Sequence, residues 1–262
     1  MRQKFLSIVN KSSYEFDKRD IEMVRLKDWW IERFLLVSNT EDEALDSLVD
    51  TMKWRKQFGV NDLTESSFPE ELYRIGEFLQ FCRDREGRQV LWLQMHRHHK
   101  CDEDKWYDMA KHYIVYWLEL YDRNNTHKGG WAMVSDCSQQ SLSNVDMDLN
   151  SFVVNTLQSR YPKGPKYLLS IDLPWLLNFV AKIVVSFMND ELRAIYKPIS
   201  SSELDGYIAP EYIPVHLTGG KYDKPLIQVP AGVKPLTKFP NFTDSDISNI
   251  YETNGRLTGE SV

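Results

Sequence analysis

The sequence has few cysteines, and it lacks the signature motifs of several common enzyme classes. Its three cysteines, Cys82, Cys101 and Cys137, are odd in number and form no CxxC pair. This pattern is typical of reduced thiols in a cytosolic compartment, and we expect no disulfide. The chain contains no GxGxxG after a strand, no GxxxxGK[ST], no GxSxG and no HExxH. Dinucleotide, P-loop, hydrolase-elbow and zinc-protease chemistry therefore lose their usual support.

Long uninterrupted apolar runs are also missing. The N-terminus has no apolar stretch of signal-peptide length, and the longest apolar run, Leu176 to Met188, is broken by Asn178, Lys182 and Ser186. We therefore expect neither a membrane-spanning helix nor entry into the secretory route.

The overall charge is modest and negative. The 262 residues include 32 basic and 38 acidic side chains, which gives a net charge of −6, and this argues against nucleic acid as a partner. A content of 42% hydrophobic and 13% aromatic residues is typical of a folded globular chain with a sizeable core.

The N-terminal part is predicted to be helical. Thr40 and Glu43 form a Thr-x-x-Glu capping box, after which apolar residues recur at helical spacing until Gly59 ends the run. A shorter helix is expected around 68–76, starting with Pro69 in a favoured first-turn position.

From residue 78 the pattern changes to strands alternating with helices. FLQFC and RQVLWLQM are short apolar runs joined by Asp84-Arg85-Glu86-Gly87, which predicts a hairpin. Helical spacing over 102–125, the strand WAMVS, a helix near 149–161, the strand KYLLSID and a helix from Pro174 follow in order. The fold class is therefore α/β, with a largely parallel sheet covered by helices.

We expect three parts. Residues 1–76 form a helical N-terminal subdomain, and residues 77–222 form the α/β domain. Residues 223–262, which contain Pro225, Pro230, Pro235 and Pro240 and end in a polar stretch, are expected to form an extended, flexible tail.

Two groups of side chains are candidates for chemistry. His96, His98, His99 and Cys101 follow a strand within six residues and could hold a metal, but a polar loop is the simpler explanation and we predict no metal site. Asp136 and Asp172 each end an apolar strand, where open α/β sheets place ligands and catalytic carboxylates. The alternative is that each aspartate caps the following helix.

The segment PWLLNFVAKIVVSF is the most informative stretch. If it is helical from Pro174, it is apolar on nearly every side. Such a helix is either buried all round or faces a second apolar medium. The second interpretation makes it a lid over an apolar cavity that can also lie against a bilayer. Between Arg160 and Lys197 the local charge is +3, which suits anionic leaflets.

Several stretches together resemble the CRAL-TRIO family of lipid-binding proteins. The run WIERFLLVSNTEDEALDSLVDTMKWRKQFGVNDL is similar to the helical N-terminal part of that family, which ends in a Trp-Arg-Lys turn, here Trp54-Arg55-Lys56. DREGRQVLWLQ, the strand ending at Asp136, YPKGPKYLLSIDLPWLLNFVAKIVVSFM and YIPVHLTGG follow in the family's order. The resemblance covers about residues 28–220.

The resemblance implies a hydrophobic cavity above the sheet, closed by a gate helix at Pro174 to Phe187, that carries one lipophile between membranes without covalent chemistry or a cofactor. It also implies a cytoplasmic protein that attaches peripherally to endomembranes. The implied lipid-binding residues are Arg55, Trp131, Met133, Trp175, Leu176, Phe179, Val180, Ile183 and Phe187.

The headgroup residues depart from the family pattern. The Glu and Lys of members that exchange phosphatidylinositol fall on Lys163 and Ile195, and the Ser and Thr that hold phosphocholine fall on Trp131 and Met133. A buried phosphate without directed donors is strongly disfavoured. We therefore expect weak phosphatidylinositol transfer and a cargo with a small or uncharged polar end.

Two other functions stay open on the sequence alone. One is a hydrolase or phosphatase that uses Asp136 or Asp172 in a cleft at the sheet edge. The other is a protein-interaction adaptor whose cavity is vestigial.

Overall fold

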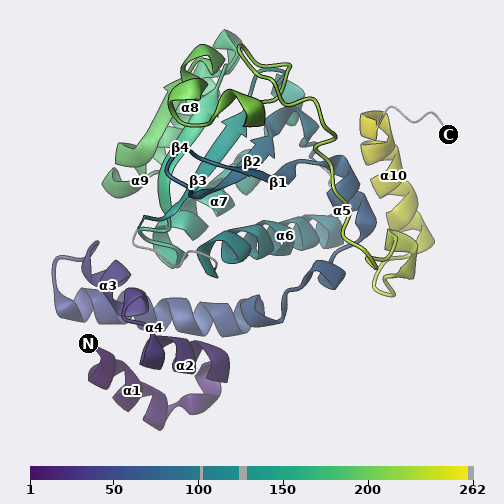
Figure 1. The fold of residues 1–262 in the computed structure, drawn as a ribbon. Coiled ribbons are helices and arrows are strands. Elements are labelled where there is room, and N and C mark those ends of the chain that lie inside the picture. Colours follow the sequence, from purple (N-terminus) through teal and green to yellow (C-terminus); the bar gives the residue numbers. More distant parts are fainter. Residues whose placement is uncertain (101–102, 124–128, 259–262) are drawn as a thin grey trace.

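The computed structural model describes residues 1–100, 103–123 and 129–258. Its N-terminal part is helical, as predicted, and lies below the sheet in Figure 1. The helices in this part are α1 (Arg2–Lys11), α2 (Lys18–Leu26), α3 (Trp29–Leu35) and α4 (Glu41–Phe58), followed by the short α5 (Glu70–Ile75).

The predicted ends of α4 are confirmed. The Glu43 amide donates to Thr40 Oγ1 (3.2 Å), and the Thr40 amide donates to Glu43 Oε2 (3.3 Å), so the capping box closes. At the other end Gly59 has φ of +71°, a left-handed conformation that glycine adopts at little steric cost.

A five-stranded sheet forms the centre of the second part, in the spatial order β1-β2-β3-β4-β5. The β1–β2 hairpin is antiparallel, and the remaining neighbours are parallel. The predicted α/β class is therefore confirmed. The strands are β1 (Phe78–Arg83), β2 (Gln89–Gln94), β3 (Trp131–Asp136), β4 (Pro165–Ile171) and β5 (Tyr196–Ile199).

The helical crossovers between the parallel strands all belong to one face of the sheet. They are α6 (Asp104–Arg123), α7 (Met147–Arg160), and the pair α8 (Asn178–Ser186) and α9 (Asp190–Ile195). Successive strand residues point to opposite faces, so Met133 and Leu168 pack on the crossover side, while Val134 and Leu169 belong to a separate core. That second core is closed by residues 200–222.

The long helix expected from Pro174 onward is divided into α8 and α9, and the strand β5 follows them. Asn189 starts a new helix, since its side chain accepts from the Leu192 amide at 2.9 Å. The strand β5 was not predicted; it contains Pro198, whose nitrogen cannot donate to a ladder. Its place at the sheet edge removes that difficulty.

The C-terminal segment differs from the expected flexible tail. It contains α10 (Asp244–Thr258), which Thr243 caps by accepting from the Asp246 amide at 3.2 Å. Leu236 and Ile250 are fully buried, and the Leu236 amide donates to Glu71 on α5 at 2.9 Å. Apolar residues within a polar stretch therefore fix this segment against α5, as Figure 1 shows.

Among the described helices, none combines the length and apolar character needed to cross a bilayer.

Buried ion pairs join the N-terminal helices to the α/β part. Arg55 on α4 donates to Asp20 at 2.9 Å and to both oxygens of Glu119 on α6 at 2.7 and 2.8 Å. Arg33 on α3 makes a two-pronged contact with Asp122 on α6 at 2.7 and 3.0 Å. Burial opposes the ionisation of Glu119, but the neighbouring guanidinium groups outweigh it and lower its pKa to about 2.

We expect Arg55→Ala to destabilise the protein by about 3–5 kcal/mol, because removing one partner leaves buried carboxylates without a counter-charge. Arg25→Ala is the control, since Arg25 pairs with Glu22 on the exposed surface and its loss is expected to cost less than about 1 kcal/mol. Urea unfolding measures both free energies. A loss below about 1 kcal/mol for Arg55→Ala would contradict the structural role of this network.

Candidate lipid site

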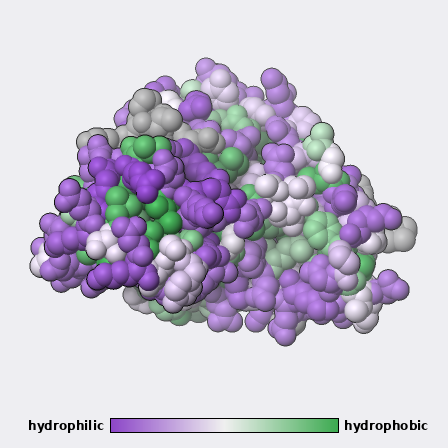
Figure 2. All heavy atoms as spheres, turned by 90° about the horizontal axis from the view of Figure 1, so that it is seen from below, coloured by the Kyte–Doolittle hydropathy of each residue, from purple (hydrophilic) through white to green (hydrophobic). Residues whose placement is uncertain are grey.

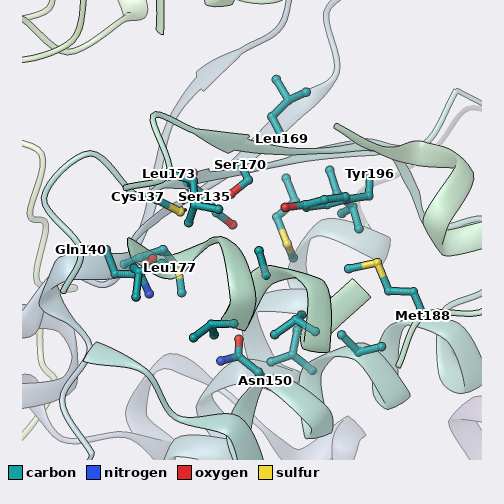
Figure 3. A pocket seen from close by; sticks show the side chains of 18 of the residues that line it. Ser135, Cys137, Gln140, Asn150, Leu169, Ser170, Leu173, Leu177, Met188 and Tyr196 are labelled. Carbon is teal, nitrogen blue, oxygen red and sulfur yellow. Dashed lines mark hydrogen bonds between the residues drawn. The ribbon is translucent and has the colours of Figure 1, made fainter. Parts of the chain in front are cut away.

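A cavity of about 140 Å³ lies between the sheet, α7 and α8. The strands supply its floor through β3, β4 and β5, α7 forms a wall, and α8 forms the roof. The lining residues are Met95, Met133, Ser135, Cys137, Gln140, Val145, Asn150, Val153, Val154, Leu157, Leu168, Leu169, Ser170, Leu173, Leu177, Val180, Ala181, Val184, Met188, Leu192 and Tyr196. Leu169 borders the cavity although its side chain points away from it, toward the second core (Figure 3).

None of these described lining residues carries a charged side chain. The polar groups are hydroxyls, amides and one thiol, and Figure 3 shows Ser135, Cys137 and Ser170 together at one end, with Met188 at the other. A ligand in this cavity therefore meets neutral hydrogen-bonding groups at this end and at Asn150 on the α7 side, and mainly apolar carbon and sulfur elsewhere.

The titratable groups of the cavity are held in their neutral forms. Burial raises the pKa of the Cys137 thiol to about 12, although the contact with Ser170 partly opposes this. The Cys137 sulfur lies 3.3 Å from the Ser170 hydroxyl oxygen. Burial also raises the pKa of the Tyr196 phenol. A reactive thiolate or phenolate is therefore disfavoured here.

The roof helix α8 has two apolar faces. Its inner face places Val180, Ala181 and Val184 on the cavity. Its outer face, with the turn before it and the residue after it, exposes five large apolar side chains. These are Trp175 (81% exposed), Leu176 (48%), Phe179 (56%), Ile183 (42%) and Phe187 (38%). Among the described residues, no side-chain hydrogen bond ties α8 to the sheet or to α7; only the carbonyl of Phe187, just beyond α8, accepts from Gln158 at 3.3 Å.

The structure therefore divides the residues that the resemblance implied. Met133 and Val180 line the cavity, whereas Trp175, Leu176, Phe179, Ile183 and Phe187 lie on the outer, solvent-facing side. Trp131 and Arg55 are not brought to the cavity. Trp131 is covered by Tyr121 of α6, with ring centroids 5.8 Å apart, and Arg55 is enclosed in the ion-pair network beneath the sheet.

The two positions aligned with the family's phosphatidylinositol residues lie in a different place. Lys163 and Ile195 line a separate cleft of about 650 Å³ together with Lys166 and Glu191. The Lys163 ammonium lies 3.4 Å from the Glu191 carboxylate. Lys163 is therefore already paired, and the cleft is separate from the cavity under α8.

The described members of the histidine cluster, His96, His98 and His99, do not line the cavity, and His98 makes an ionic contact instead. His98 lies between two carboxylates, with Nδ1 3.2 Å from Glu77 and Nε2 3.7 Å from Asp146. Asn144 Nδ2 donates to the carbonyls of His96 and His98 at 2.9 Å each. The fourth member of the cluster, Cys101, lies outside the described residues.

The two strand-end aspartates bind neighbouring backbone amides. Asp136 is fully buried; its carboxylate accepts from the Ser138 amide at 3.1 Å and lies 2.7 Å from His216 Nε2. Burial opposes the ionisation of Asp136, but these hydrogen bonds outweigh it and lower the pKa. Asp172 accepts from the Ser201 amide at 2.8 Å. The Ser138 hydroxyl donates to Asp136, so these side chains do not form a serine–histidine–aspartate relay.

Some lining residues were missed although the sequence carries their pattern. Asn150, Val153, Val154 and Leu157 recur at helical spacing on α7, and Ser135 follows Met133 at the two-residue period of a strand. Ser170 follows Leu168 in the same way. The pattern gives the shared face, but it does not say that this part of the face borders a cavity.

Comparison with known proteins agrees with this architecture. Residues 73–219 match the model of the CRAL/TRIO domain, which is more than half of the chain, and the protein therefore belongs to the CRAL/TRIO domain family. Members of this family typically bind hydrophobic ligands.

The relatives are distant. CRAL-TRIO domain-containing protein C365.01 of Schizosaccharomyces pombe is 23% identical over 215 residues, which cover 78% of this chain and 58% of that protein. Protein C23B6.04c of the same yeast is 25% identical over 82% of this chain and 21% of its own length. Patellin-3 of Arabidopsis thaliana is 24% identical over 69% of this chain and 40% of its own length. The chain thus spans less than two thirds of each of these relatives.

Among solved structures, the crystal structure of Sfh5 superimposes with a TM-score of 0.57 at 17% sequence identity, covering 90% of this chain and 82% of that one. At this level of identity the likeness concerns the fold.

The ionic contact of His98 predicts a pH-dependent contribution to stability. Burial opposes protonation, but Glu77 and Asp146 outweigh it and raise the pKa of His98 to about 10. The stabilisation is then complete below pH 6.5, the pKa of an ordinary histidine, and is lost as the pH rises toward 10. In urea titrations at pH 6, the free energy of unfolding of His98→Gln and of Glu77→Gln should each be lower than that of the wild type. This difference should shrink as the pH rises to 10. A difference that does not change over this range would refute the ionic contact.

Proposed function

We propose that the protein binds one neutral lipophile in the cavity under α8 and exchanges it at a membrane that α8 contacts. The two-faced character of α8 carries this proposal. The inner face of α8 lines an apolar cavity, and its outer face, with the turn before it, exposes Trp175, Phe179 and Ile183. These exposed side chains can leave water only by entering a bilayer or by binding another apolar partner.

The cavity volume supports a movable roof. Its 140 Å³ is close to the size of an engineered cavity that admits benzene, and ligand pockets usually have volumes of about 300–1,000 Å³. An acyl chain or a sterol therefore needs more room. The roof is the part that can give way, since α8 is held mainly by apolar contacts.

Membrane contact supplies the driving force for this movement. Withdrawing a sixteen-carbon chain from water is worth on the order of 12 kcal/mol at about 0.8 kcal/mol per CH₂, so release into water is slow. When α8 enters a bilayer, its outer face is buried there and its inner face leaves the cavity. The bilayer favours the open state by this difference in affinity.

The chemistry of the lining supports a neutral cargo. A phosphate buried among Ser135, Cys137, Ser170, Gln140 and Asn150 would lack a counter-charge, which is costly. A lipophile with one hydroxyl or carbonyl group needs only the hydrogen bonds that these side chains offer. Sterols, retinoids and neutral glycerides fit this description better than phosphatidylinositol.

We propose no catalytic role for Asp136 or Asp172, since both carboxylates are occupied by backbone amides. The small cavity volume gives some support to the adaptor alternative, in which the site takes no ligand. Ligand loading separates these two functions.

We also propose a narrower kinship and a division of the chain. IERFL, VNDLTESSFP, SNVDMD and DLPWLLNFVAKIV resemble the N-terminal part of motile sperm domain-containing protein 2. In this proposal residues 1–76 support the lipid-binding part, residues 77–222, and the protein attaches peripherally to cytoplasmic membrane faces.

The first test is ligand loading. Protein incubated with mixed liposomes should retain about one lipophile per chain by solvent extraction and mass spectrometry, with sterol, retinoid or neutral lipid exceeding phosphatidylinositol. Ala181→Phe fills the cavity from the roof and should reduce loading at least tenfold, whereas Lys182→Phe adds the same side chain on the exposed side and should load normally. An empty wild type, or equal loading of both variants, would count against the proposal.

The second test concerns membrane contact. Phe179→Asp combined with Ile183→Asp should lower partitioning onto vesicles and lipid transfer at least tenfold, because an aspartate costs up to about 2.5–3.5 kcal/mol in a hydrocarbon layer. Folding should persist, since both side chains are largely exposed. Tyr14→Asp combined with Leu26→Asp, at exposed positions on the helical part, is the matched control. Unchanged transfer by the α8 variant would show that another surface meets the membrane.

A further inference from the structure

A second group of exposed apolar side chains lies where α3 ends. Leu35, Leu36 and Val37 are 42%, 62% and 38% exposed. Among the described residues, no other three consecutive large apolar side chains are exposed to this extent. The view from below is mostly hydrophilic, with a few separate hydrophobic patches (Figure 2). A run of this kind is unusual for a surface that meets only water.

This turn and α8 border a common surface. Leu36 and Val37 line a hollow of about 630 Å³ whose other side contains Gln158 and Asn189. Gln158 accepts from the Asn189 amide at 2.8 Å and donates to the carbonyl of Phe187. Phe187 is the last exposed apolar side chain of the α8 face. In Figure 1 the turn between α3 and α4 lies on the same side of the molecule as α9 and α8.

The charged groups between the two apolar sites largely cancel in pairs. Lys163 lies 3.4 Å from Glu191, and Arg193 lies 3.2 Å from Asp190. Arg160 also pairs with Asp50. A surface with apolar ends and a nearly neutral centre does not match a strongly charged protein partner. The local charge of +3 between Arg160 and Lys197 favours anionic leaflets, but these pairings leave the centre of this surface nearly neutral. The surface therefore suits the interface of a zwitterionic bilayer, where apolar side chains insert and paired charges stay at headgroup level.

We infer that the bilayer contacts this protein at two separate apolar sites, α8 and the turn Leu35–Val37. This inference rests on the proposed membrane contact of α8. Two attachment points restrict how the molecule can tilt on the bilayer. The turn also keeps the protein attached while α8 swings away from the cavity, because the second contact acts at high effective concentration.

Leu36→Asp tests the turn on vesicles of dioleoylphosphatidylcholine. Its side chain is 62% exposed, so the fold should be retained, and circular dichroism with thermal unfolding verifies this. Vesicle affinity should fall about tenfold. Leu26→Asp changes a side chain that is 71% exposed on α2, apart from this surface, and should bind like the wild type.

A second measurement keeps the inference testable without disrupting the turn. In a Cys101→Ser background, Leu36→Cys labelled with an environment-sensitive dye should shift to the blue on vesicles, and labelled Leu26→Cys should not. The inference is overturned if the dye at position 36 stays in water, or if Leu36→Asp binds normally while Phe179→Asp with Ile183→Asp does not. That last result would leave the proposed membrane contact of α8 intact. A wild-type protein that does not bind vesicles would refute both the contact of α8 and the contact of the turn.

Discussion

The arrangement of the whole molecule depends on two buried arginines that hold the N-terminal helices against α6. Arg33 and Arg55 both lie over the Trp30 ring, at 4.7 and 5.1 Å from its centroid. Each guanidinium also binds a carboxylate of α6. Because a buried charge is tolerated only with a well-placed partner, this contact permits one relative position of the two parts.

The same network reaches the floor of the cavity. Arg33 Nε donates to the carbonyl of Pro162 at 2.8 Å, and the Tyr161 hydroxyl donates to Glu119 at 2.9 Å. These contacts fix the turn that leads into β4, which carries Leu168 and Ser170 into the cavity. The N-terminal helices therefore act on the candidate lipid site from a distance, by setting where this strand begins. The network also engages Arg55, which the family resemblance implied as a lipid-binding residue.

Charge and apolar surface are separated in this protein. Ionic groups are concentrated at the junction of the two parts, where they specify geometry, and the described lining of the cavity contains none. Opposite the sheet, α8 has little polar attachment and has apolar residues on both faces. The junction of the two parts is thus held by paired charges, whereas α8 is held by non-directional apolar contacts, which another apolar medium can replace.

The sequence by itself determined the elements whose signals are local. The Thr40–Glu43 box, the Gly87 turn and the short apolar run of β3 each depend on residues close together in the chain, so they were predicted correctly. The all-round apolar character of α8 likewise indicated a second apolar environment. The apolar residues within the C-terminal segment were weaker signals, because Leu236 and Ile250 become buried only when this segment packs near α5.

Only the tertiary structure decided which residues reach the cavity. Trp131 and Met133 lie on the same face of β3, but Tyr121 of α6 covers the first and the second meets the space below α8. Arg55 finds its partners Asp20 and Glu119 at separations of 35 and 64 residues. Strand period and helix spacing specify a face, whereas the crossing of helices over strands decides what covers each position on it. That crossing depends on contacts between residues far apart in the chain, which no local pattern contains.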